Sequence, residues 1–74
     1  MKVVFDMQKI GDNINNIRIA NKISIKEFSI RTKISVSSLY RYKKGASVPN
    51  LKSIIKICNC LNVPIDHIIS YYLI

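Results

Sequence analysis

Several residue types are scarce in this sequence of 74 residues. It has no tryptophan, one histidine, two cysteines, two glycines and two prolines. Two cysteines cannot form the disulfide framework of a small secreted domain, so we expect a reducing, cytoplasmic setting. Cys58 and Cys60 would point to different sides of a helix, and no second ligand pair accompanies them. We therefore expect no metal and no cofactor, and no catalysis by the lone His67.

Long apolar runs and acidic residues are also missing. No stretch approaches the roughly 20 residues of a membrane-spanning helix, and the first residues lack the parts of a secretory signal. We therefore expect no association with a membrane. Only four residues are acidic against twelve that are basic, for a net charge of +8. This balance indicates an anionic partner, and the short chain leaves little room for a sequestered active site or a small-molecule ligand.

Isoleucine, in contrast, is abundant. The fifteen isoleucines help to raise the hydrophobic share to 49%, and the mean hydropathy is +0.16. A disordered basic tail would be poor in such residues, so we expect the chain to fold around a core. No repeat, linker or low-complexity stretch divides it, which predicts a single domain over residues 1–74.

Helical periodicity runs through most of the chain and predicts an all-α fold. Five short helices are expected, each bounded by local start and stop signals. They cover about residues 6–21, 24–32, 35–44 and 50–61, with a fifth after Pro64.

The start and stop signals are specific. Asp6, Ser35 and Asn50 are N-cap residues, and Ser24 with Glu27 forms a capping box in which each satisfies a backbone N–H of the other. Gly45 ends the third helix, because glycine adopts a left-handed conformation at little cost. The residues expected on inner helix faces are Ile10, Ile14, Ile17, Leu39, Tyr42, Leu51, Ile54, Ile55, Cys58 and Leu61.

The second and third predicted helices are separated by only Lys33, Ile34 and Ser35. Two short helices on so tight a turn must cross steeply, as in a helix-turn-helix. Positive charge gathers around them, since residues 18–56 hold ten basic side chains and one acid, Glu27. The coincidence of the two features favours DNA binding over a merely solvated basic surface.

The exposed face of the third helix carries small, hydroxylated or basic side chains. Arg41 is suited to the edge of guanine, and Val36 to the methyl group of thymine. Hydroxyls near helix N-termini, together with lysines, are expected to bind phosphate. The predicted base contacts are Val36, Ser37, Tyr40 and Arg41. The predicted phosphate contacts are Ser24, Ser35, Lys43, Lys44 and Ser47.

A larger set of spaced residues extends over residues 10–68. It comprises Ile10, Gly11, Ile14, Ile17, Arg18, Ile23, Ser24, Phe28, Thr32, Ile34, Ser35, Leu39, Arg41, Gly45, Pro49, Leu51, Ile57, Leu61, Val63, Asp66 and Ile68. This set resembles the lambda-repressor/Cro type of helix-turn-helix domain, the XRE family. The resemblance implies five helices, a two-fold dimer on operator DNA, and the third helix in the major groove. It places base contacts at the four residues named above.

Three positions depart from the family pattern. Ile25 stands where the family commonly has a phosphate-binding Gln, and Lys33 stands where the turn favours Gly. A lysine in a left-handed turn costs on the order of 1 kcal/mol. Lys43 replaces a Glu that often pairs with the Arg of the first helix, here Arg18. Because these two would be like charges, either Arg18 swings out or another acidic residue pairs with it. We expect this end of the third helix to shift outward and Lys43 to contact phosphate.

Apolar residues collect at both termini, in excess of what one face of a terminal helix can bury. Large exposed apolar patches mark interfaces, so we expect a homodimer in which segments 1–5 and 70–74 take part. A short strand pair between the termini is a further prediction. The alternative is that both termini fold back on their own core. The predicted interface residues are Ile65, Ile68, Ile69 and Tyr72.

The sequence as a whole favours a dimeric transcriptional regulator that binds double-stranded DNA. We expect a repressor that occludes a promoter at an inverted repeat, with half-sites about 34 Å apart or a multiple of that distance. The alternative is a protein-interaction module, such as an antitoxin or antirepressor, that uses the apolar C-terminal surface. RNA binding is disfavoured because there is no aromatic stacking platform.

Overall fold

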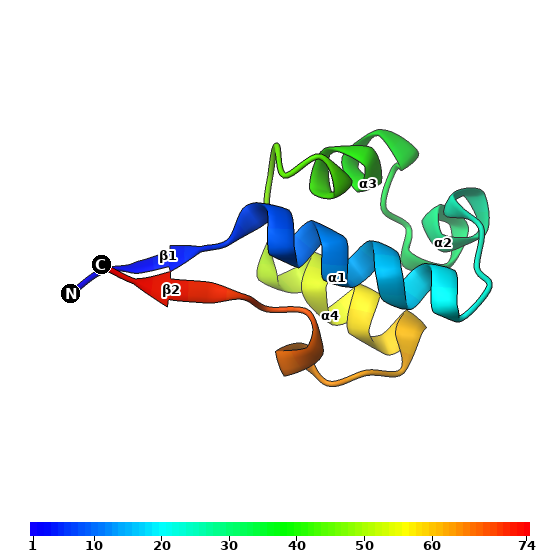
Figure 1. The fold of residues 1–74 in the computed structure, drawn as a ribbon. Helices are drawn as coiled ribbons and strands as arrows, with labels where there is room; N and C mark the ends of the chain where they lie inside the picture. The colour runs from blue at the N-terminus through cyan, green and yellow to red at the C-terminus, as the bar shows by residue number, and fades with distance from the viewer.

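The computed structural model describes residues 1–74 and has four α-helices between two short terminal strands (Figure 1). None of its helices combines the length and the apolar character needed to cross a membrane. The elements in chain order are β1 (Val3–Phe5), α1 (Met7–Ala20), α2 (Ile25–Thr32), α3 (Val36–Lys43), α4 (Leu51–Leu61), the 3-10 turn η1 (Ile65–His67) and β2 (Tyr71–Leu73).

The four predicted N-caps are confirmed. The side chains of Asp6 and Ser24 accept hydrogen bonds from backbone N–H groups three residues on, at 3.0 and 3.1 Å. Ser35 and Asn50 do the same at 3.1 and 2.8 Å. The second half of the capping box is not formed, because the Glu27 carboxylate accepts from Arg31 at 3.0 Å.

The predicted fifth helix is wrong, because the mostly helical fold has four α-helices, not five, and adds a small two-stranded sheet. After Pro64 the chain makes only the turn η1 and then extends into β2. Ile68 is fully buried, and the Asn13 amide donates to its carbonyl at 3.1 Å. Beyond this anchor the sequence is rich in aromatic and β-branched residues, which favour a strand when a partner strand is available.

That partner is β1, and the predicted strand pair between the termini is confirmed. The strands are antiparallel, with Val3 opposite Leu73, Val4 opposite Tyr72 and Phe5 opposite Tyr71. They form a two-stranded ribbon that projects from the helices and carries both chain ends (Figure 1). The ribbon contributes to the elongated shape of the molecule, 39 × 23 × 21 Å.

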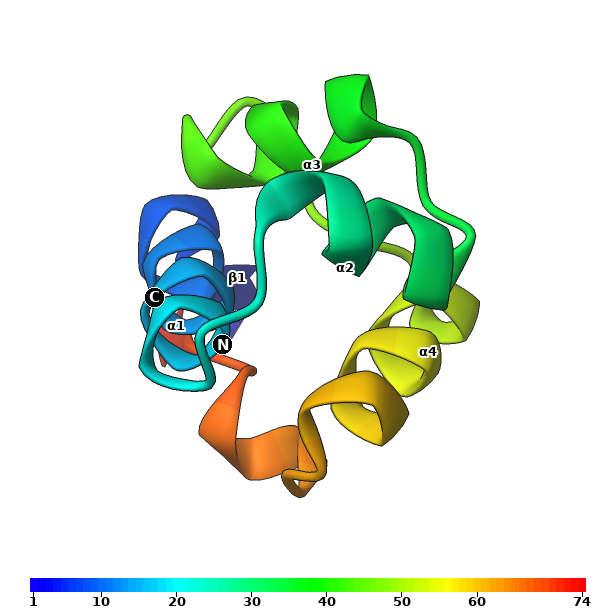
Figure 2. The same ribbon diagram turned by 90° about the vertical axis from the view of Figure 1, so that its right-hand side faces the viewer.

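The core lies between the four helices, which surround it in the end-on view of Figure 2. In α4 the predicted inner face is partly wrong, since Leu51 and Ile55 are 66% and 50% exposed. The buried stripe of α4 instead follows Ile54, Ile57 and Leu61. Leu51 and Ile55 form the next row on the helix surface. The core cluster comprises Ile10, Ile14, Ile23, Phe28, Ile34, Leu39, Tyr42, Ile57, Leu61 and Ile68.

Candidate nucleic-acid interface

The turn between α2 and α3 is held by a small set of hydrogen bonds. Lys33 adopts the left-handed conformation, with φ 58° and ψ 29°. The Ser29 hydroxyl donates to the Ile34 carbonyl at 2.6 Å, and the Ile34 N–H donates to Thr32 Oγ1 at 3.3 Å. With Ile34 buried below, these bonds fix the position of α3 relative to α2.

The other end of α3 is held against α1. A Cβ atom at Gly11 would lie 1.8 Å from the carbonyl oxygen of Tyr42, so only glycine allows this approach. The Gln8 amide also donates to the Lys43 carbonyl at 2.9 Å. The expected outward shift of this end of α3 is therefore wrong, because its backbone packs directly on α1.

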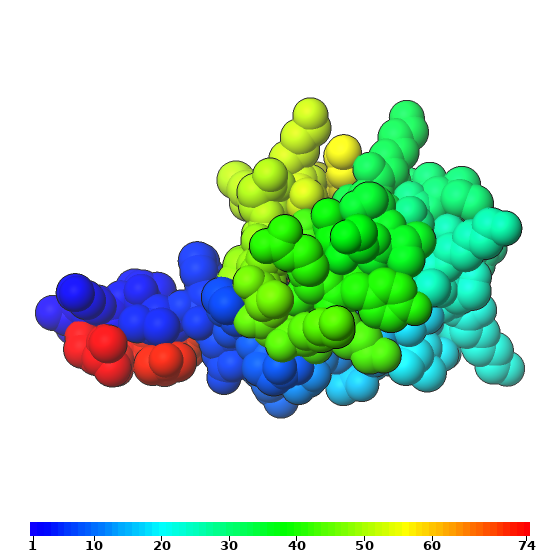
Figure 3. Space-filling model, turned by 90° about the horizontal axis from the view of Figure 1, so that it is seen from above, coloured from blue at the N-terminus to red at the C-terminus, as the bar shows by residue number.

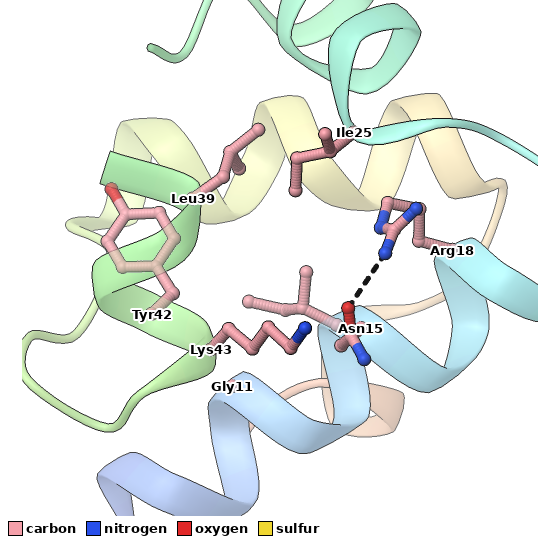
Figure 4. A pocket seen from close by; sticks show the side chains of 8 residues that line it. Gly11, Asn15, Arg18, Ile25, Leu39, Tyr42 and Lys43 are labelled. Atoms are coloured by element: carbon pink, nitrogen blue, oxygen red, sulfur yellow. Dashed lines mark hydrogen bonds between the residues drawn. The ribbon is translucent and has the colours of Figure 1, made fainter. Parts of the chain in front are cut away.

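Neither Arg18 nor Lys43 has an acidic partner. The Arg18 guanidinium donates to the Ile23 carbonyl at 2.7 Å and to Asn15 Oδ1 at 2.9 Å. Figure 4 shows the Lys43 side chain extending toward Asn15 from the other side. The hollow that these residues line has a volume of about 10 Å³, which is room for one water molecule at most. Arg18 thus hydrogen-bonds to groups of α1 and of the loop that follows it.

The four predicted base-contact residues share one exposed face of α3. Val36 and Tyr40 are 36% and 44% exposed, and Ser37 and Arg41 also face solvent. Spacing of four residues places such side chains one above another on a helix. Leu39 and Tyr42 occupy the opposite, buried face. In Figure 3, α3 (green) lies on the surface that faces the viewer, away from the ribbon.

The predicted phosphate contacts lie around α3. Ser24, Lys43 and Lys44 are exposed, and Ser47 is half-buried in the loop between α3 and α4. Arg31 is the one basic side chain that pairs with an acid. The remaining cations of this surface are free to attract an anion.

Ser35 is the predicted phosphate contact that already has a partner. Its hydroxyl donates to Ser38 Oγ at 3.0 Å while it accepts from the Ser38 N–H. The Ser24 hydroxyl, in contrast, accepts one hydrogen bond from the Glu27 N–H, and its own O–H donates none within the protein. Ile25, at the position where the family commonly has Gln, packs against the core instead.

The predicted dimer residues do not form one face. Ile68 is fully buried in its own core, so its assignment to an interface is wrong. Ile65, in η1, is 45% exposed, and Tyr72, in β2, is 52% exposed. Ile69 lies between them in the sequence and is half-buried. The single helix face that would have joined these residues does not exist.

The cysteines and the histidine lie away from this surface. Cys58 packs against the core, and burial raises the pKa of its thiol. Cys60 is also a free thiol, and His67 is exposed at the end of η1. No group of three or more His, Cys, Asp or Glu side chains is placed to hold a metal ion.

Two residues that position α3 were not identified as functional from the sequence. Gly11 matched the family pattern, and a glycine inside a helix is itself a signal of close packing, because it costs about 1 kcal/mol relative to alanine. Gln8 gave no signal, since its partner, the Lys43 carbonyl, is 35 residues away in the sequence.

Comparison with known proteins agrees with this geometry. Residues 13–72 match the Cro/C1-type HTH DNA-binding domain. The chain belongs to this family. The resemblance to the XRE type of domain is thereby confirmed. No curated protein gives a significant match to the sequence.

Three solved structures share the fold of this family member. The restriction-modification controller protein C.AhdI from Aeromonas hydrophila has a TM-score of 0.80 at 19% identity, covering 85% of this chain and 96% of that one. An HTH_3 family transcriptional regulator from Vibrio cholerae has a TM-score of 0.77 at 21% identity, covering 84% and 35%. The clp gene regulator ClgR from C. glutamicum has 0.76 at 13% identity, covering 84% and 80%.

Proposed function

We propose that this protein is a transcriptional regulator that binds specific double-stranded DNA sequences through α3. The observation that carries the proposal is the exposed face of α3, which presents Val36, Ser37, Tyr40 and Arg41 together. The helix is fixed on both sides, by the turn from α2 and by the close contact with α1 at Gly11. Recognition of bases requires such a rigidly placed helix, because an error of about 1 Å misaligns the contacts.

The four residues of this face have distinct roles in the proposal. The Arg41 guanidinium donates two hydrogen bonds to guanine O6 and N7, and Val36 contacts a thymine methyl group. Ser37 and Tyr40 bond to neighbouring base edges through their hydroxyls. Val36 and Ser37 lie in the first turn of α3, the part of the recognition helix that contacts base edges in helix-turn-helix proteins.

Phosphate contacts orient the protein on the duplex. Ser24 donates its free hydroxyl hydrogen, and Ser35 exchanges its bond to Ser38 for one to phosphate. Lys43, Lys44 and Ser47 bind the backbone on the other side of α3. The ammonium groups of Lys43 and Lys44 form no ion pair in the protein. Binding to DNA therefore releases counterions without first breaking an ion pair.

Two copies of the protein read an inverted repeat in this proposal, with half-sites about 34 Å apart or a multiple of that distance. Occupation of the major groove excludes other proteins, so repression by promoter occlusion needs no further activity. The controller protein and the two regulators that share the fold are consistent with a regulatory role.

A matched pair of substitutions tests the proposal. Binding sites are first selected from random duplex DNA, and affinity is then measured for the wild type, Arg41→Ala, Lys44→Ala and the control Lys2→Ala. Arg41→Ala should weaken binding to the selected site by about 1–3 kcal/mol and relax specificity at one base position. Lys44→Ala should weaken all sequences alike and lower the salt dependence by about one unit of slope.

The control Lys2→Ala removes a charge from the ribbon, outside the cationic region, and should change affinity little. Unchanged binding of Arg41→Ala to the selected site would show that Arg41 does not read a base. Failure of the selection to enrich any sequence would favour the alternative of a protein-interaction module.

A further inference from the structure

The side chains of the terminal ribbon alternate between its two faces, as in any pair of strands. Because Val3 pairs with Leu73 and Phe5 pairs with Tyr71, these four side chains lie on the same face, called here the ribbon face. They are 64%, 52%, 50% and 59% exposed in that order. The ribbon face is therefore entirely apolar or aromatic, without a charged residue.

The helices do not cover the ribbon face. None of its four residues belongs to the core cluster or packs against it. The sheet has only two strands, so the outer edges of β1 and β2 also lack partners. A two-stranded ribbon is marginally stable in water at best, and exposed edges are templates for pairing. Burial of this face would stabilise the ribbon as well as the complex that buries it.

The size of the ribbon face suits a weak interface. Its exposed area is roughly 400 Å², in the range of the largest apolar patch on a typical monomer. Two such faces packed together remove roughly 800 Å² from water, which is below the standard size of a stable interface. For an interface of this size we expect a dimer that forms at micromolar rather than nanomolar concentrations.

Charge and shape point to a second copy of this chain as the occupant. Two copies carry +8 each and repel one another. This repulsion is weakest when they meet through a face that has no charged residue. The ribbon projects from one end of the molecule, to the side of α3 (Figures 1 and 3). A two-fold axis through overlapping ribbons can place both α3 helices on the same side. To enter successive major grooves, the two α3 helices would have to lie about 34 Å apart or a multiple of that distance.

We propose that two copies of this chain associate through the ribbon face of Val3, Phe5, Tyr71 and Leu73. This inference supplies the interface of the proposed DNA-binding dimer and rests on the proposed function for its biological role. It also corrects the interface expected from the sequence, since Ile68 is in the core and the fifth helix is absent.

Sedimentation equilibrium of the full chain without DNA tests the proposal. The wild type should pass from monomer to dimer as its concentration rises through the micromolar range. The variant Tyr71→Lys/Leu73→Lys should raise the dissociation constant by at least about 100-fold, because it buries like charges at the contact. The variant Tyr71→Glu/Leu73→Glu should fail to self-associate in the same way, but a mixture of the two variants should form a heterodimer.

The matched control is Ile19→Lys/Ile30→Lys, which places the same charges on α1 and α2 at positions 56% and 68% exposed. It should dimerise as the wild type does. At a concentration where every chain is monomeric, circular dichroism should show the same helical unfolding transition in all variants, because the ribbon face is outside the core.

Three results would overturn the proposal. They are a wild type that stays monomeric, a ribbon-face variant that dimerises normally, and a control that loses the dimer. A monomeric wild type that instead sediments with phosphatidylcholine vesicles would assign the face to lipid. Since no DNA is present, failure here is distinct from failure of the proposed DNA binding.

Discussion

The helical body (residues 7–68) and the terminal ribbon place the same kind of side chain in opposite surroundings. Phe28, in α2, is 1% exposed, whereas Phe5, in β1, is 50% exposed. The isoleucines of the body's core have exposures of 8% or less, but Ile74 beyond β2 is 70% exposed. A single average hydropathy hides this division between residues that stabilise the fold and residues left for a partner.

Charge is divided in the opposite sense. Residues 18–56 of the body carry ten basic side chains, and the ribbon face carries none. Water solvates the charged groups of the body and leaves them accessible to an anion. The apolar ribbon face, in contrast, is stabilised by removal from water. The two proposals follow this division, with DNA as the partner of the body and a second copy of the chain as the partner of the ribbon.

The largest effect expected from this comparison is on stability. Phe28→Ala should lower the free energy of unfolding by about 3–5 kcal/mol, because it leaves a cavity in the core. Phe5→Ala should lower it by less than about 1 kcal/mol, because half of that side chain is already in water. Urea unfolding followed by circular dichroism, at a concentration where the chain is monomeric, measures both.

Equal losses in the two variants would show that the ribbon is part of the cooperative core. That outcome would break the distinction between body and ribbon. The Phe5→Ala measurement should be repeated at high protein concentration. There the loss of unfolding free energy caused by Phe5→Ala should be larger, because the dimer forms.

A second prediction concerns the contact that positions α3. Gly11→Ala should cost about 1–3 kcal/mol of stability, because its Cβ would overlap the Tyr42 carbonyl and force α3 away from α1. The selected DNA site should also be bound more weakly, even though Gly11 touches no base. Asn16→Ala, on the exposed side of α1, is the control. Gel-shift titration and thermal unfolding measure the two effects, and unchanged values for Gly11→Ala would refute the packing role.

The smallest effect is expected at the turn of the helix-turn-helix. Lys33→Gly should raise the free energy of unfolding by about 0.5–1 kcal/mol, because glycine adopts the left-handed conformation without strain. Lys26→Gly, inside α2, should instead lower it by about 1 kcal/mol. Urea unfolding of the two variants should therefore give changes of opposite sign. A loss of stability in both would mean that the Lys33 conformation carries no strain.

Local signals account for most of what could be predicted. The caps at Asp6, Ser24, Ser35 and Asn50 bond to backbone groups three residues away, so each can be identified within its own segment. The exposed face of α3 follows from helical spacing alone. The family could also be identified from the sequence, because its pattern consists of residues at fixed spacings along the chain.

The errors came from contacts between distant segments. Ile65, Ile68, Ile69 and Tyr72 satisfy helical spacing, but β2 forms because Val3–Phe5, some 70 residues earlier, supplies a partner. The contact of Gly11 with Tyr42 is likewise tertiary. A strand pair between the termini was expected from their composition, but no local pattern encodes its register, the loss of the fifth helix to β2, or the position of α3 on α1.

The cationic face around α3 should bind specific duplex DNA. The most direct test is the affinity of the wild-type chain for its selected duplex over a series of salt concentrations, beside a scrambled duplex of equal length. The wild type should bind the selected duplex more tightly than the scrambled one and lose affinity steeply as salt rises, with a slope magnitude of about 4 or more in a double-logarithmic plot. A flat response to salt, or equal affinity for both duplexes, would contradict it.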